Sequence, residues 1–82
     1  MRLISPSPAR SYILIQFDAP FFMETLIKIK NHEMELVQCL TTSFVKGINE
    51  ALVNIERLLP GNYILQIFLK EGLLEEAPFN KH

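Results

Sequence analysis

The ten residues 58–67 (LLPGNYILQI) constrain the fold of this chain more than any other stretch. Pro60 fixes its own φ angle, and Gly61 can adopt the positive φ that many sharp turns require. A strand is expected to follow, because apolar residues with a period of two lie on one face of a strand: Tyr63, Leu65 and Ile67. In β-sandwiches this spacing is typical of a tyrosine corner, where the buried ring donates its hydroxyl to backbone a few residues upstream. The sequence therefore predicts a structural corner built from Leu58, Gly61 and Tyr63.

Alternating apolar residues predict further strands before and after this corner. The expected strands cover residues 10–18, 25–31, 34–43, 51–55, 63–70 and 73–81. Their expected core-facing residues are Ile13, Ile15 and Phe17, then Thr25, Ile27 and Ile29, and then Ala51, Val53 and Ile55. Residues 21–59 contain few helix breakers, but Thr41, Thr42 and Ser43 are unfavourable inside a helix. Six or seven short strands indicate an all-β fold, a small antiparallel immunoglobulin-like β-sandwich.

Two of the segments between these strands are interpreted as connections. Residues 21–24 (FFME) are expected to form a loop whose rings fold over one end of the core. The start of a helix and an exposed contact surface remain open as alternatives for this segment. Residues 44–49 are expected to form a second connection, with Gly47 as its pivot.

The first nine residues are expected to be a lead-in or linker to a single domain that covers residues 10–82. Pro6 and Pro8 push their neighbours toward extended geometry, which disfavours a helix or a central strand. The first residues hold no apolar run of signal-peptide length, so we expect no export signal in this chain itself. The chain is then cytoplasmic, a fragment of a longer protein, or missing its true start.

Size and composition exclude several classes of protein. The 82 residues suffice for one small domain, and a hydrophobic content of 49% argues against disorder. A formal net charge of −1 lacks the excess of basic residues that is typical of proteins that bind nucleic acid. No apolar run approaches the roughly 20 residues of a membrane span, so no membrane insertion is expected.

Residue types suited to catalysis or metal binding occur without the partners that they need. Neither His32 nor His82 has a second metal-binding residue at a suitable spacing. Ser43 lacks the histidine base and orienting acid that a catalytic serine needs. Most carboxylates are expected on solvated faces or in turns: Glu24, Glu33, Glu35, Glu50, Glu56, Glu71, Glu75 and Glu76. Cys39, the single cysteine, lies in an apolar stretch and is expected to be a small, packed or half-packed hydrophobic residue. The sequence therefore predicts a protein that is not an enzyme and needs no cofactor or metal.

The order of several short motifs resembles that of a known family. The motifs are ISPSPARSY (4–12), TLIKIKN (25–31), LV (36–37), KGIN (46–49), VNIERLLPGNYIL (53–65) and FNK (79–81). Together they resemble the C-terminal sorting domains of the type IX secretion system (Por secretion system) of Bacteroidetes. The family usually has a "D-x-x-G" turn, and here Glu35 or a neighbour in residues 31–34 replaces its glycine. The resemblance covers nearly all of the chain, with the motifs in the same order.

This resemblance implies a targeting role at the C-terminus of a larger exported protein. Such domains are recognised in the periplasm by an outer-membrane receptor or shuttle and guide an upstream cargo domain through the outer membrane. A sortase commonly removes them as the cargo reaches the cell surface or the medium. For this chain, we expect the last strand to carry the recognition signal, with Phe79 and Lys81 as its anchors.

A second interpretation of the same strands is an immunoglobulin-like or fibronectin-like module for adhesion or protein binding. Phe21, Phe22 and Met23 would then form its contact patch. At this size, burial and chain entropy nearly cancel, so marginal stability is expected. Pairing of two copies through an exposed edge strand is a further expectation.

Overall fold

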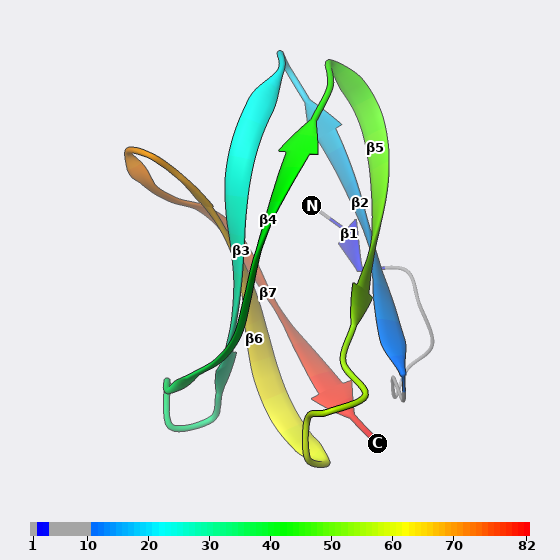
Figure 1. The fold of residues 1–82 in the computed structure, drawn as a ribbon, viewed down its shortest axis with the longest axis vertical. Helices are drawn as coiled ribbons and strands as arrows, with labels where there is room; N and C mark the ends of the chain where they lie inside the picture. Colours follow the sequence, from blue (N-terminus) through cyan, green and yellow to red (C-terminus); the bar gives the residue numbers. More distant parts are fainter. Residues whose placement is uncertain (1, 4–10) are drawn as a thin grey trace.

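The computed structural model describes residues 2, 3 and 11–82, whose regular structure is all β-strand (Figure 1). The strands are β1 (Arg2–Leu3), β2 (Tyr12–Ala19), β3 (Met23–Asn31), β4 (Leu36–Phe44), β5 (Gly47–Asn54), β6 (Gly61–Leu69) and β7 (Gly72–Lys81). Within the expected lead-in, β1 pairs with β2, while residues 1 and 4–10 lie outside the described part. The predicted all-β fold is confirmed.

Two antiparallel sheets pack face to face in these residues. One sheet has the strand order β1-β2-β5, and the other has the order β4-β3-β6-β7. The chain passes from one sheet to the other at the β2–β3, β4–β5 and β5–β6 connections, as Figure 1 shows. This arrangement is the β-sandwich that the strand pattern predicted.

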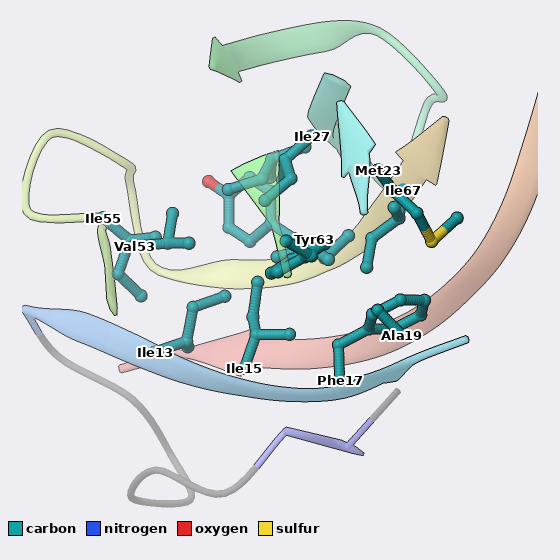
Figure 2. Close-up of a cluster of buried hydrophobic side chains, with 13 residues drawn as sticks. Ile13, Ile15, Phe17, Ala19, Met23, Ile27, Val53, Ile55, Tyr63 and Ile67 are labelled. Carbon is teal, nitrogen blue, oxygen red and sulfur yellow. The ribbon is translucent and has the colours of Figure 1, made fainter. Parts of the chain in front are cut away.

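The core lies between the two sheets and is built by the residues that alternate along each strand. The predicted inward face of β2 is confirmed, because Ile13, Ile15 and Phe17 are all buried. Figure 2 shows these side chains pointing from β2 toward those of the opposite sheet, among them Ile27, Tyr63 and Ile67. Thr25, Ile29, Val53, Ile55 and Leu65 are also buried, and Ala51 is half-buried against them. Burial of one face of β2, β3 and β6 explains why their alternation was readable in the sequence.

The packing expected for the loop over residues 21–24 is wrong. Phe21 and Phe22 are both 59% exposed, so their rings do not fold over the core. Met23 instead begins β3 and is buried, with 4% of its surface exposed. The β2–β3 connection is only Pro20 to Phe22, which is too short to turn back over the end of the sandwich.

The connection expected over residues 44–49 is shorter in the structure than predicted. Phe44 is the last residue of β4, is 1% exposed and stacks on Phe17 with the ring centroids 4.9 Å apart. Gly47 already begins β5, where it pairs with Ala19. Only Val45 and Lys46 lie between the strands. Gly47 keeps a pivotal role, because its φ of +105° lies in a region that other residues rarely adopt.

The β3–β4 turn is held by Asn31 and strained at Met34. The Asn31 side-chain oxygen accepts hydrogen bonds from the backbone N–H groups of Glu33 (2.9 Å) and Glu35 (3.0 Å). Met34 has a φ of +63°, a left-handed conformation that costs a side-chain-bearing residue free energy. The third strand was expected to begin at residue 34, but it begins at Leu36 because Met34 and Glu35 complete this turn.

Replacing Met34 with glycine should stabilise the protein. Relief of the left-handed conformation gains about 1–2 kcal/mol, and the added freedom of the unfolded chain removes about 0.4–1 kcal/mol of that. We therefore expect the free energy of unfolding, measured by urea titration, to rise by about 0.8 kcal/mol, and by no more than about 1.6 kcal/mol. The matched control is Glu33→Gly in the same turn, which relieves no positive φ and should destabilise. Equal effects of the two variants would contradict this account of Met34.

Candidate recognition site

The turn before β6 has the geometry of a tyrosine corner. The Tyr63 ring is buried, and its hydroxyl donates a hydrogen bond to the backbone carbonyl oxygen of Leu59 at 2.5 Å. Leu58 is half-buried against the core, and its N–H donates to the carbonyl oxygen of Ile55 at 3.0 Å. Gly61 has a φ of +155°, at the edge of the region that favours glycine. These contacts fix the direction in which β6 enters the sheet.

The last strand brings Phe79 to this corner. Phe79 lies directly opposite Tyr63 in the β6–β7 ladder, and their rings stack with centroids 5.6 Å apart. Its side chain is half-buried and packs against the core. Such a cross-strand aromatic pair contributes about 0.5–1.5 kcal/mol beyond the burial of its surface. Phe79 therefore anchors the end of β7 to the sandwich.

Lys81 completes the same end of β7. It lies opposite Gly61 and is buried, with 8% of its surface exposed. Long lysine side chains lay their methylene groups along apolar surface while the ammonium group finds a polar partner. The structure thus brings Phe79 and Lys81, which were expected to act in recognition, together with the corner residues Gly61 and Tyr63. We call this end of β7, residues 79–81, and the corner beneath it the β7 anchor.

The outer side of the β7 anchor carries a shallow hollow that the sequence did not indicate. It has a volume of about 410 Å³ and is lined by His32, Asn62, Tyr63, Ile64, Pro78 and Phe79. At its margin, the Asn80 side-chain amide donates to the side-chain oxygen of Asn62 at 2.9 Å. The lining residues come from β6, β7 and the β3–β4 turn. They lie together because of the way these strands pair in the sheet.

The crossover between the two sheets depends on Asn49. Its side-chain oxygen accepts from the Val45 N–H at 3.0 Å, and its amide donates to the carbonyl oxygens of Val45 and Gly47, both at 2.8 Å. The same amide reaches the carbonyl oxygen of Phe17 at 3.4 Å. The KGIN motif therefore serves a structural purpose, since glycine makes the turn and asparagine closes it.

Two absences can be stated for the described residues. No three His, Cys, Asp or Glu side chains among them lie close enough to hold a metal ion. No helix in this part of the chain is long and apolar enough to cross a membrane. Cys39 is exposed on β4, so the expectation of a packed or half-packed cysteine is wrong. Its neighbours are apolar in sequence, but Cys39 lies opposite Lys28, on the solvent-facing side of an edge strand.

Of the apolar contact patch expected at Phe21, Phe22 and Met23, only the two phenylalanines are exposed. Phe21 and Phe22 are exposed in the β2–β3 connection, Val45 is exposed in the β4–β5 connection, and Ile48 is exposed at the start of β5. Figure 1 shows these two connections at the same end of the sandwich. Met23 lies in the core and cannot contribute to a contact surface.

Comparison with known proteins shows a family match over most of the chain. The family model for a secretion system C-terminal sorting domain matches residues 3–74. No match was found among curated proteins or among solved structures. The matched range includes the corner and the KGIN crossover and stops before Phe79 and Lys81. This chain therefore belongs to the type IX secretion C-terminal sorting domains.

Proposed function

We propose that this chain is a non-catalytic sorting domain that directs an exported cargo through the type IX secretion system across the outer membrane. Membership of a family of non-enzymatic secretion signals, over residues 3–74, is the observation that carries this proposal. A protein that bears such a domain is exported to the cell surface or the extracellular space. We propose that the cargo is an upstream domain and that the chain passes from the periplasm to the surface with it.

The proposed partners are an outer-membrane receptor or shuttle and a sortase that later removes the domain. We place the recognition signal on β7, which is the last strand and forms one edge of the four-stranded sheet. A receptor can add a strand to such an edge, or it can capture side chains from it. Pro78 removes one backbone donor, so strand addition would be interrupted there. The outward residues Glu76, Pro78 and Asn80 are exposed and accessible to a partner in the folded domain.

We propose that Phe79 and Lys81 act as anchors of this signal by holding the end of β7 in register. Both side chains lie on the core side of β7, at the corner around Tyr63. Their loss would free the end of β7 from β6 and change the edge that the receptor meets. Capture of these two side chains themselves would require the end of β7 to detach first.

Export of a reporter fused to residues 1–82 tests this assignment in a host that has the type IX system. Deletion of residues 79–82, and the variants Phe79→Ala and Lys81→Ala, should retain the reporter in the periplasm. The matched controls Phe22→Ala and Lys70→Ala change exposed residues away from the β7 anchor, and both should export normally. Protease resistance of the retained fusions separates a lost signal from an unfolded domain. Export of the truncated fusion at the full-length level would overturn the assignment to β7.

A second candidate function is a protein-contact module, favoured by the exposed rings of Phe21 and Phe22. Large apolar side chains exposed together are costly in solution and often mark a contact surface. The double variant Phe21→Ser and Phe22→Ser distinguishes the two functions. The sorting function predicts unchanged export, whereas lost export with the fold intact would place the contact at this end of the sandwich.

A further inference from the structure

The two edges of the four-stranded sheet are protected to very different degrees. An exposed strand edge offers unpaired N–H and C=O groups, which proteins commonly guard with charged side chains or proline. At one edge, β7 contains Pro78 and the core-side residues Glu75 and Lys81. At the other edge, β4 (Leu36–Phe44) contains neither proline nor any charged residue. The sheet is therefore open to strand addition at β4.

The geometry of β4 suits the addition of another strand. Among the described residues, β4 pairs only with β3, and its register is continuous from Gln38 to Phe44. The irregularity in this ladder is confined to the first end, near Leu36. Apolar side chains are exposed at both ends of the strand: Leu36, Val37 and Val45. A partner strand would cover these side chains and satisfy the free backbone groups.

The charges at the two ends of β4 indicate which strand fits there. Glu33 and Glu35 precede the strand, and Lys46 follows it. A second β4 laid antiparallel brings the acidic end of each copy beside the lysine of the other. A parallel arrangement would bring like charges together at both ends. The edge is therefore complementary to itself in the antiparallel direction.

We propose that two copies of this chain pair antiparallel through their β4 edges, about a two-fold axis at Leu40. Leu40 is the midpoint of β4, so this register uses the whole uncharged strand. Cys39 of one copy then faces Thr41 of the other, and the two four-stranded sheets become one continuous sheet. The pairing goes beyond the sorting function and does not depend on it. It leaves β7, at the opposite edge of each sheet, free for a receptor.

Sedimentation equilibrium of the 82-residue chain tests the pairing. We expect dimers at about 100 µM, where a complex with a Kd of about 10 µM is mostly formed. Thr41→Lys places a charge on the exposed side of β4 near the axis and should raise this Kd at least about tenfold. The control Leu52→Lys places the same charge on β5, the open edge of the other sheet, and should leave the Kd unchanged. A monomeric wild-type chain, or dissociation by Leu52→Lys alone, would overturn the proposal.

Cross-linking tests the register on the unaltered chain. With Leu40 on the axis, the two Cys39 side chains are diagonal neighbours about 7–8 Å apart. A short bis-maleimide that spans this distance should join two wild-type copies. In the control, Cys39→Ser combined with Ser43→Cys, the thiols lie six residues apart along the ladder, about 20 Å. That control should not be joined, and efficient cross-linking of the control but not of the wild type would exclude this dimer.

Discussion

Replacing Phe44 with alanine is expected to unfold most of the protein at 25 °C. The Phe44 ring is 1% exposed and stacks on Phe17, so its removal leaves a cavity between the two sheets. Truncation of a buried phenylalanine costs about 3–5 kcal/mol, and a core of this size rarely supplies more than about 3–5 kcal/mol in total. Urea titration followed by far-ultraviolet circular dichroism measures the loss.

The controls for this prediction are Phe21→Ala and Phe22→Ala, which remove the same atoms from exposed positions. Each should change the free energy of unfolding by less than about 0.5 kcal/mol, as is usual for surface substitutions. The comparison decides which phenylalanines build the core. A larger loss at Phe21 or Phe22 than at Phe44 would contradict the packing described for this end of the sandwich.

Replacing Tyr63 with phenylalanine is expected to lower the free energy of unfolding by about 1–3 kcal/mol. The variant keeps the ring, its burial and its stacking on Phe79, and it removes only the hydroxyl. The carbonyl oxygen of Leu59 loses its 2.5 Å donor in a partly buried setting. The cost is thus that of one unmade hydrogen bond, and the same urea titration detects it.

Tyr12→Phe is the matched control, because Tyr12 lies on the outer face of β2 and is 43% exposed. Water can satisfy a hydroxyl at such a position, so the expected change is below about 0.5 kcal/mol. Equal losses at Tyr12 and Tyr63 would show that the corner hydrogen bond contributes nothing specific. A loss within error at Tyr63 would lead to the same conclusion.

The strand cores were predictable from the sequence because burial on one face imposes a period of two. Ile13, Ile15 and Phe17 alternate with polar or half-exposed residues, and Leu65 and Ile67 continue the pattern that Tyr63 begins. Such alternation needs no knowledge of which strand lies beside which. The β-sandwich followed from the number of strands and from the corner motif.

The strand ends were less predictable, because they depend on contacts between distant parts of the chain. Phe44 belongs to β4 because Phe17, far away in sequence, completes its environment. Met23 belongs to β3 for the same reason, since Phe44 lies opposite it in the ladder. Apolar runs such as Phe21 to Met23 do not indicate which of their members will be buried.

The surroundings of Phe79 and Lys81 could not be predicted from the sequence either. The end of the chain was expected to carry Phe79 and Lys81, but nothing local indicated that they meet the corner around Tyr63. That meeting requires β7 to pair with β6 in one particular register. The hollow beside them is a product of the same register, because its residues come from three separate segments.

The central claim is that this chain suffices to direct a cargo through the type IX system. The most direct test is to append residues 1–82 to a reporter that a signal peptide delivers to the periplasm, in a strain with the type IX system and in one without it. We expect the reporter to leave the cell only when both the appended chain and the secretion system are present. A reporter that stays in the periplasm of the competent strain, or that leaves the deficient strain equally well, would contradict it.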